Sequence, residues 1–583
     1  MRAAFRLRLR IVLVGIALVA LLILTRLYFV QIVHGEEYSL KADRQYVSSG
    51  SALFDRGSIY FTRKDGALVS AATLATGFVV TINPKLLTDR EAAYQTIAGI
   101  ASSTISREAF MKAAANPQVV YVEVAHHLPE AVGKALGEKK IPGVTVLRER
   151  WRVYPGGALA AQTIGAVAYS ANDDVLKGRT GIEARYEDTL SRSGDGLYKN
   201  FFAELFSNLG NALVSARDAR QGDVVTTLEP EVETRLVSNV AKVQTKYASK
   251  ETGGIIMDPK TGAIIAMASV PSYDANDFSN VSTGTLTNPL VSHVYEFGSI
   301  MKALTMAAAL DAGVVTPEST YNDKGCITLD TSTICNFDLK ARGVVSMQQI
   351  LSQSLNLGAA HLASKLGPER FRSYFSTLGF GVKTGIDLPA EASGLVGNLQ
   401  SPRQIEYATA AFGQGVAITP LAMIRALGAL ANGGEIARPH VGSAVQLDSG
   451  VSKSLEWEGS MRVFSPEAAR AVSEMLTSVV DHSLAHGTLT IPTLSVAAKT
   501  GTAQLPAPDG GYYDNRYFHS FFGYFPSYAP RFIILLYTND PQGVEYASET
   551  LTATFMDLVH FLNDYYDLPP DRLPGQGEGA PRS

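Results

Sequence analysis

The sequence predicts an α/β protein whose main domain is one sheet with a long helical insertion between its first and later strands. Residues 253–270 are two apolar runs joined by a turn that contains Pro and Gly, the pattern of a β-hairpin. Helical periodicity dominates residues 299–485. Strand-like runs return just before 499, at 518–525 and at 532–538, and a helix follows near 545–566. This order describes one sheet that is filled from both ends of the domain's sequence.

Helix boundaries within the insertion are indicated by capping residues. Ser346 with Gln349 has the spacing of a capping box at the start of a helix. Ser465 followed by Pro466 is an N-cap residue with proline at the first helical position. A further predicted helix, LGAAHLASKL at 357–366, begins after a turn, and residues 420–431 form another.

The N-terminal segment predicts an uncleaved membrane anchor. Residues 1–10 hold four arginines and no acid, and an apolar run follows from Ile11 to Val33. A helix over residues 11–33 would span roughly 35 Å, enough for a hydrocarbon core of about 30 Å. The alternative is a cleavable signal peptide, but no small-residue cleavage site follows the run. The arginines predict a cytoplasmic N-terminus, with the rest of the chain outside.

The exterior part divides into two domains and a tail. Residues 34–222 mix strand-like runs, helical pieces and Gly-rich turns without a nucleophile motif, so we expect a non-catalytic pedestal of mixed α/β structure. A strand-like VVTTL and an amphipathic helix with Val232, Leu236 and Val240 indicate a second domain that starts near 223 and extends to 567. The Pro- and Gly-rich residues 568–583 predict a disordered tail.

Composition argues against several kinds of partner. The chain has 583 residues, with 51 Lys plus Arg against 55 Asp plus Glu, so no basic excess points to nucleic acid. Its two cysteines, Cys326 and Cys335, cannot form a four-cysteine zinc site, and we expect neither a metal nor a cofactor. On the oxidising side of a membrane these cysteines are candidates for a disulfide, with two reduced buried thiols as the alternative.

The first candidate site motif is Ser299-Ile300-Met301-Lys302, which stands where a loop enters a helix. A spacing of three places Ser299 and Lys302 on one helix face, so the amine can reach the hydroxyl. A lysine can accept a serine proton only if burial or a nearby cation keeps it partly neutral. An N-cap serine beside a solvated lysine is the alternative interpretation, although the chain contains no other Ser-x-x-Lys.

Two further motifs offer polar groups to the same cleft. Ser354-Leu355-Asn356 lies in a break between two predicted helices. Lys-Thr-Gly begins at 260, 383 and 499, but only the last copy continues a strand, because the other two lie in turns. At this copy Gly501 would let a peptide-like substrate approach the backbone, while Lys499, Thr500 and Thr502 would hold a carboxylate.

Together and in this order, the three motifs resemble those of the penicillin-recognising serine acyltransferases. Segments at 55–59, 152–167, 178–191 and 412–423 also look like the pedestal and transpeptidase modules of class B penicillin-binding proteins, so the resemblance covers nearly the whole chain. Two positions depart from the family pattern. Leu355 stands where Ser or Asp is frequent, and Tyr60 stands where Asp usually follows.

The resemblance implies the family's fold, an antiparallel sheet with helices on both faces plus an all-helical cluster. It also implies a peptidoglycan D,D-transpeptidase that β-lactams inhibit covalently. Ser299 would attack the penultimate D-Ala carbonyl of a stem peptide, Lys302 would be the base, Ser354 would relay a proton, and Asn356 would hold Lys302 and the substrate amide. Lys499, Thr500, Gly501 and Thr502 would bind the terminal carboxylate. The backbone N–H groups of Ser299 and Thr502 would form the oxyanion hole.

The resemblance also implies partners. Residues 34–222 show no glycosyltransferase module, so the glycan strands would be polymerised by a polytopic membrane polymerase of the SEDS type, in complex with other division proteins. The segments 412–415, 520–532 and 539–543 look more like division-type than elongation-type members. An elongation-type enzyme, a membrane-anchored β-lactam hydrolase or sensor, and a catalytically silent division scaffold are the alternatives.

Overall fold

The computed structural model describes residues 19, 21, 25, 54–101, 105–169, 176–192, 221–448 and 450–572. Almost all of the predicted cytoplasmic tip and membrane anchor, residues 1–33, lies outside these ranges. Within them, no helix combines the length and apolarity needed to cross a membrane. The chain forms two compact units, one built around Leu74–Trp151 and the other from Arg56–Thr73, Arg152–Arg192 and the described residues of Lys199–Ser583.

The first unit is a small α/β layer. The later residues of β2 (Leu68–Ile82) pair with β3 (Val122–Leu128) and β4 (Val144–Val153), and the helices are α3 (Arg90–Ala101), α4 (Arg107–Ala114) and α5 (Glu130–Glu138). Apolar side chains alternate along β2, so Val80 and Ile82 face one core with Ile97, Phe110 and Leu136 of the helices. This unit therefore has its own hydrophobic core.

A buried ion cluster joins sequence segments that are far apart in the second unit. The Arg56 guanidinium donates to Glu183 Oε2 at 2.6 Å, and the Arg152 guanidinium donates to Glu183 Oε1 at 2.7 Å and to the Gly57 carbonyl at 2.7 Å. All three charged side chains are almost completely buried. The cluster brings together three of the segments that carry the family resemblance, at 55–59, 152–167 and 178–191. The short elements of this part of the unit are β1 (Ile59–Thr62), α6 (Ala161–Ile164), β5 (Val167–Tyr169), β6 (Leu176–Gly178), α7 (Gly181–Arg185), α8 (Glu187–Leu190), β7 (Gly222–Thr226), β15 (Gly442–Leu447) and β16 (Ser452–Ser454).

The main sheet of the second unit has the strand order β18-β19-β20-β8-β9, and all neighbours are antiparallel. The strands are β8 (Glu251–Met257), β9 (Ile264–Val270), β18 (Ala497–Pro506), β19 (Tyr512–Phe525) and β20 (Phe532–Asn539). The predicted hairpin at 253–270 is β8 with β9, and the three later strands complete the sheet. The expectation of one sheet filled from both ends of the domain is confirmed.

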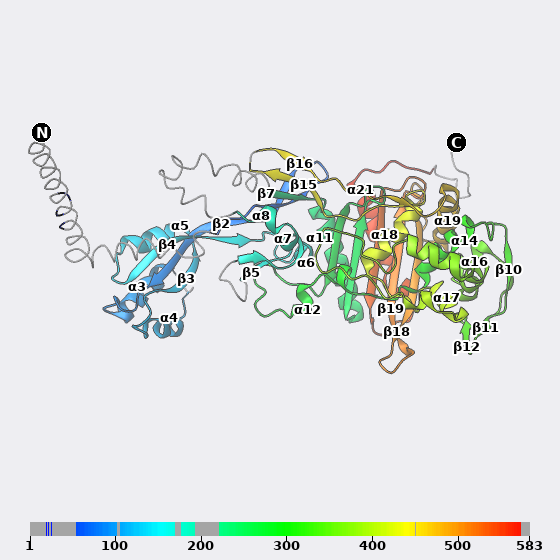
Figure 1. Ribbon diagram of the computed structural model, residues 1–583, viewed down its shortest axis with the longest axis horizontal. Helices are drawn as coiled ribbons and strands as arrows, with labels where there is room; N and C mark the ends of the chain where they lie inside the picture. Colours follow the sequence, from blue (N-terminus) through cyan, green and yellow to red (C-terminus); the bar gives the residue numbers. More distant parts are fainter. Residues whose placement is uncertain are drawn as a thin grey trace, which may run out of the picture. The chain divides into compact units, whose positions relative to one another are not determined.

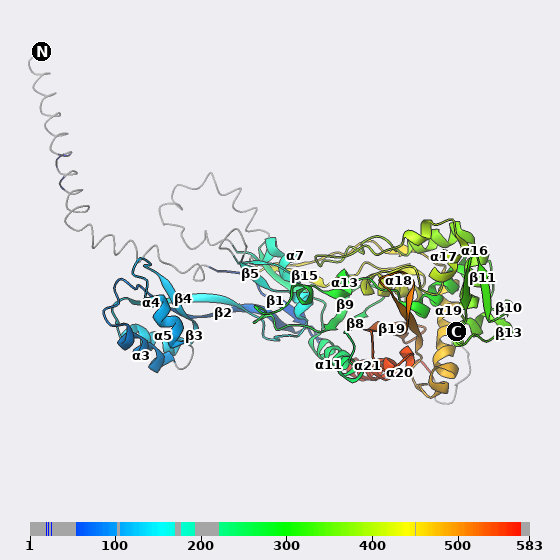
Figure 2. The ribbon, with the colours of Figure 1, turned by 90° about the horizontal axis from the view of Figure 1, so that it is seen from below.

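Both faces of this sheet are buried, which explains why its strands are nearly continuous apolar runs. Ile256, Ile534 and Phe521 pack on one face against α11 (Pro230–Tyr247) and α21 (Thr552–Tyr565). Their neighbours Ile255 and Leu535 point to the other face, into the core shared with the helical cluster. Figure 2 shows α11 and α21 on one side of these strands and α18 (Pro420–Ala431) on the other.

The helical cluster follows β9 in the chain and lies at one end of the unit (Figure 1). Its capping residues act as the sequence predicts. Ser346 and Gln349 form a capping box at α15, and the Ser465 hydroxyl accepts from the Ala468 N–H at the start of α19. The segment includes α12 (Thr283–Leu286), α13 (Pro289–Ser292), the 3₁₀ turn η4 (Gly298–Ile300), α14 (Met301–Asp311), β10 (Thr320–Asp323), β11 (Cys326–Leu329), β12 (Ser332–Cys335), β13 (Gly343–Ser346), α15 (Met347–Ser352), α16 (Asn356–Thr377), α17 (Gln404–Ala410) and α19 (Pro466–Ser478).

The segment expected to be a disordered tail begins with described residues that make contacts. The Asp571 carboxylate accepts from the Ser495 N–H at 2.7 Å and from the Ser495 hydroxyl. The Arg572 guanidinium pairs with Asp481 at 2.8 Å. A polar composition does not reveal such specific partners. The residues from 573 onward lie outside the described ranges.

Candidate active site

The three motifs meet at the junction of the helical cluster and β18. Ser299 lies in η4, and Lys302 follows in the first turn of α14. Ser354 lies in the turn between α15 and α16, and Asn356 is the first residue of α16. Lys499 lies in β18, the edge strand of the main sheet. Helices and a strand that are distant in sequence therefore bring all five predicted residues into one site.

Lys302 is held by the second motif. Its amine lies 2.6 Å from the Ser354 carbonyl, 2.7 Å from Asn356 Oδ1 and 3.2 Å from Ser354 Oγ. The Ser299 hydroxyl makes no hydrogen bond to any residue that the structure describes. A neutral amine has two N–H donors and one lone pair, and the two nearest partners are carbonyl oxygens that can only accept. If Lys302 is neutral, these two oxygens accept both of its N–H groups and leave its lone pair for a hydroxyl.

The backbone of Ser354 directs both of its oxygens to the lysines. Its φ of 54° is in the left-handed region, which is uncommon for a serine and often marks a functional site. Its carbonyl faces Lys302, and its hydroxyl lies 3.1 Å from the Lys499 amine as well as near Lys302. The Ser354 hydroxyl thus bridges the two lysines, accepting from one while it can donate to the other.

Both lysines are removed from water. Lys302 is 1% exposed and Lys499 is 2% exposed. Burial, and secondly the charge of Lys499, hold the pKa of Lys302 well below its usual value. Burial lowers the pKa of Lys499 to about 8. The lowered pKa of Lys302 favours the neutral form that a base needs, whereas Lys499, with a pKa of about 8, stays largely charged at neutral pH and suits an anion.

At Gly501, β18 lies in close contact with the backbone just before Ser299. A Cβ at Gly501 would lie 2.5 Å from the Phe297 carbonyl and 2.4 Å from Ser520 Oγ. The Ser520 hydroxyl donates to the same carbonyl at 2.7 Å, two residues before Ser299. Gly501 therefore has a role within the protein that the sequence analysis, which considered only the substrate, did not identify.

The remaining residues of the third motif lie along β18. Thr500 and Thr502 are both half-buried, and Thr502 Oγ1 accepts from the Ala547 N–H at 3.1 Å. Because β18 pairs with β19 on one side and is the edge of the described sheet, its other side has no strand partner. An extended peptide can add to such an edge.

The other two Lys-Thr-Gly copies have structural roles. Lys260 is exposed in the turn between β8 and β9, where its N–H donates to Asp258 Oδ1 at 2.8 Å. Lys383 is also exposed, and the next residue, Thr384, donates from its hydroxyl to Glu391 at 2.6 Å. Their contexts agree with the turn assignment made from the sequence.

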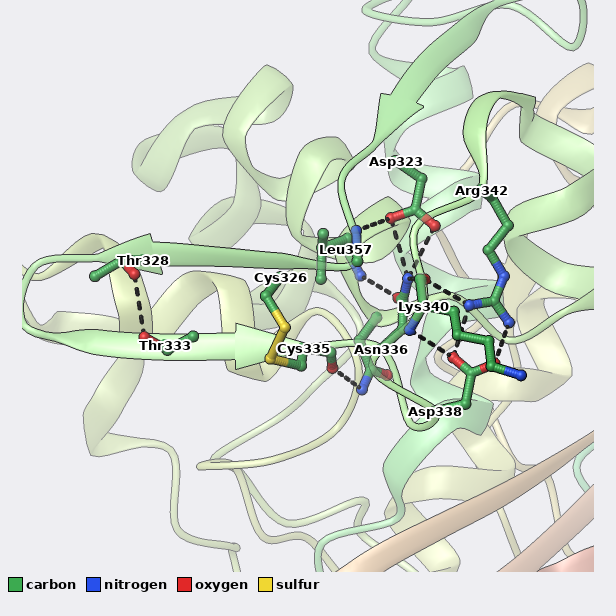
Figure 3. The surroundings of a disulfide bond; sticks show 12 residues. Asp323, Cys326, Thr328, Thr333, Cys335, Asn336, Asp338, Lys340, Arg342 and Leu357 are labelled. Atoms are coloured by element: carbon green, nitrogen blue, oxygen red, sulfur yellow. Dashed lines mark hydrogen bonds and ion pairs between the residues drawn. A yellow bond between two sulfur atoms is a disulfide. The ribbon is translucent and has the colours of Figure 1, made fainter.

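The structure joins Cys326 to Cys335 by a disulfide (Figure 3). Hydrogen bonds connect this part of the chain to the site. The Cys335 carbonyl accepts from Asn356 Nδ2 at 3.0 Å, and Asn336 Oδ1 accepts from the Leu357 N–H at 3.2 Å. No sequence pattern indicates these contacts. Asn336 belongs to no motif, and the Cys335 contact uses a main-chain carbonyl, which every residue has. The described residues hold no group of His, Cys, Asp or Glu side chains suited to a metal ion.

Comparison with known proteins identifies two domain models. The penicillin binding protein transpeptidase domain matches residues 252–560, and the penicillin-binding protein dimerisation domain matches residues 54–200. Stage V sporulation protein D of Bacillus subtilis is 27% identical over 95% of this chain and 85% of its own length. The probable peptidoglycan D,D-transpeptidase FtsI of Caulobacter vibrioides is 30% identical over 69% of this chain and 63% of its own length.

Solved structures have the same fold. Penicillin binding protein 3 of Mycobacterium tuberculosis, crystallised with aztreonam, superposes with a TM-score of 0.66 at 22% identity, covering 89% of this chain and 97% of that one. Penicillin binding protein 2X of Streptococcus thermophilus gives a TM-score of 0.70 at 21% identity, covering 89% and 81%.

Proposed function

The chain belongs to the class B penicillin-binding proteins of the FtsI type, and from this premise we propose how its site works. It is a serine-type peptidoglycan D,D-transpeptidase, which cross-links stem peptides through an acyl-enzyme, releases D-Ala and is inhibited by β-lactams. The observation that carries the mechanism is the contact set of Lys302, whose two carbonyl partners suit a neutral amine.

In the first step the Ser299 hydroxyl attacks the penultimate D-Ala carbonyl as Lys302 takes its proton. The C–O bond of the ester forms, and the peptide C–N bond to the terminal D-Ala breaks. The leaving nitrogen needs one proton, which Lys302 returns through the Ser354 hydroxyl. This relay is supported by the position of that hydroxyl, 3.2 Å from Lys302 and 3.1 Å from Lys499. The amine of a second stem peptide then attacks the ester carbonyl. The new C–N bond forms, the C–O bond to Ser299 breaks, and a proton of the amine passes to the Ser299 oxygen.

Substrate placement follows from β18. The terminal carboxylate binds Lys499 together with Thr500 and Thr502, because a buried ammonium and two hydroxyls offer charge-assisted contacts. The stem peptide adds to the free side of the strand next to Gly501, and the backbone N–H groups of Ser299 and Thr502 stabilise the oxyanion. The edge position of β18 and the contact of Gly501 with the segment before Ser299 support this arrangement.

The cellular setting completes the proposal. Residues 11–33 anchor the protein in the bacterial cytoplasmic membrane, with residues 1–10 in the cytoplasm and the transpeptidase domain outside. There the enzyme works in septal wall synthesis beside a SEDS-type glycan polymerase and other division proteins. The names of relatives support the septal role, since FtsI homologues and a sporulation protein are among them.

The test is covalent labelling at Ser299. Membranes containing the full chain or its Ser299→Ala variant are treated with a fluorescent penicillin, and the wild type alone should give a labelled band. Purified wild type should also release D-Ala from a pentapeptide substrate in the presence of an acceptor amine. A labelled Ser299→Ala band, or failure of the purified wild type to transfer the pentapeptide to the amine with release of D-Ala, would contradict the mechanism.

A further inference from the structure

The disulfide hairpin of β11 and β12 contacts the predicted catalytic amide directly. Cys326 and Cys335 are register partners at the base of the hairpin, where the disulfide joins them. Figure 3 shows the hairpin extending from this bond, with Thr328 and Thr333 paired near its far end. At this base the Cys335 carbonyl accepts a hydrogen bond from Asn356 Nδ2 at 3.0 Å. The hairpin thus ends at the site.

An asparagine amide carries an acceptor and a donor at opposite ends of one planar group. With Nδ2 held by the Cys335 carbonyl, Oδ1 faces the Lys302 amine at 2.7 Å. Turning the amide over would place two donors together at Lys302 and two oxygens together at Cys335. The Cys335 carbonyl therefore selects the orientation in which Asn356 accepts from Lys302.

The next residue fixes the same helix end. Asn336 is 1% exposed, its Oδ1 accepts from the Leu357 N–H, and its Nδ2 donates to both carboxylate oxygens of Asp323 at 3.0 and 2.9 Å. The last residue of the hairpin, Cys335, and the residue that follows it, Asn336, therefore bind the first two residues of α16. This alignment depends on the position of the hairpin base.

The hairpin packs against the core through Ile327, Leu329 and Ile334, but no third strand of the described residues pairs with it. Its strands form a separate two-stranded sheet of four residues each, and its outer residues Thr328 and Thr333 are exposed. Two-stranded hairpins of this length are marginal in water. The disulfide closes the hairpin at its base and so limits its opening.

We propose that the Cys326–Cys335 disulfide, through the Cys335 carbonyl, positions the Asn356 amide against Lys302, so that Ser299 is acylated faster in the disulfide-bonded protein than in the reduced protein. This inference rests on the proposed function. Cys335 and Asn336 are positioning residues, because they act through Asn356 and Leu357 and not on the substrate. Misplacement of a catalytic group by about 1 Å can cost about 100-fold in rate, so we expect reduction to slow acylation by about tenfold or more.

The experiment separates binding from acylation. The dissociation constant of the non-covalent penicillin complex and the acylation rate constant are measured for the wild type, with and without dithiothreitol, and thiols are counted under each condition. We expect the rate constant to fall about tenfold on reduction, with the dissociation constant unchanged within about threefold. Thr333→Ala, at the exposed end of the same hairpin, should behave as the wild type does in both conditions.

Two variants test the route. Cys326→Ser/Cys335→Ser should be slow and insensitive to dithiothreitol. Asn356→Ala should be slow in its oxidised form and should lose little more on reduction, because the group that the hairpin positions is gone. The proposal is overturned if folded wild type with two free thiols keeps its acylation rate, if only the dissociation constant changes, or if reduction slows Asn356→Ala as much as the wild type. Oxidised wild type that is not acylated at all would instead refute the proposed function.

Discussion

Lys499→Ala distinguishes the working Lys-Thr-Gly copy from the two exposed copies. Lys499 is 2% exposed and its amine bonds the Ser354 hydroxyl, whereas Lys260 and Lys383 are exposed. Loss of one charge-assisted contact to the penicillin carboxylate costs about 1.5 to 3 kcal/mol, or about 10- to 150-fold in rate. Lys260→Ala and Lys383→Ala should stay within about threefold, since surface substitutions rarely exceed about 0.5 kcal/mol.

A second effect of Lys499→Ala has a defined sign. The charge of Lys499 helps to hold the pKa of Lys302 down, so its removal raises that pKa and leaves less neutral base at a given pH. The acid limb of the acylation profile should therefore move to higher pH. The assay is the second-order rate constant for a fluorescent penicillin from pH 5 to pH 9, because an end-point measurement hides slow acylation. Equal sensitivity of Lys260→Ala or Lys383→Ala in folded protein would refute the site.

Three further substitutions test the base and the interior. Lys302→Arg keeps a positive charge but cannot supply a neutral amine, so acylation should fall by orders of magnitude with an unchanged melting temperature, and near-normal acylation would contradict the assignment. Glu183→Gln leaves Arg56 and Arg152 buried without their shared carboxylate and should cost about 3 to 5 kcal/mol in urea unfolding, whereas a loss under about 1 kcal/mol would contradict the burial argument. Burial raises the pKa of Glu233 to about 8, so the wild type loses stability as pH rises from about 4.5 to about 8. The melting temperature of Glu233→Gln minus that of the wild type should therefore increase as pH rises from about 4.5 to about 8. A difference that stays constant over this range would contradict the raised pKa.

The main sheet could be predicted because its signals are local. Apolar runs, the turn residues after Met257 and the caps at Ser346 and Ser465 each act within a few residues. The Ser299–Lys302 pair is equally local, since both lie within one helical turn of each other. Resemblance to a family supplied the grouping of the three motifs, which no periodicity indicates.

Other features of the site depend on contacts that the sequence does not encode locally. The left-handed backbone of Ser354 could not be predicted, because that conformation is usually indicated by a glycine and this residue is a serine. The contact of Gly501 with the Phe297 carbonyl could be predicted only if it were known which segments lie together. The hydrogen bond from Asn356 to Cys335 uses a main-chain carbonyl. The same holds for the tail, where Asp571 meets Ser495 across 76 positions.

The pairing of β8 with β20 also determines when the site can form during synthesis. Ile255 is the register partner of Leu535, so 280 positions (535 − 255) separate the paired residues. Contacts of such long range are slow to form, and chains are made from the N-terminus. Ser299 and Lys302 are therefore synthesised long before the strand that carries Lys499. Until β20 is synthesised, the edge of β8 that pairs with it has no strand partner there. A nascent chain that stops before β18 and β20 has the nucleophile but cannot assemble the sheet edge that receives the substrate, so the anion-binding side forms only after β18 has been made.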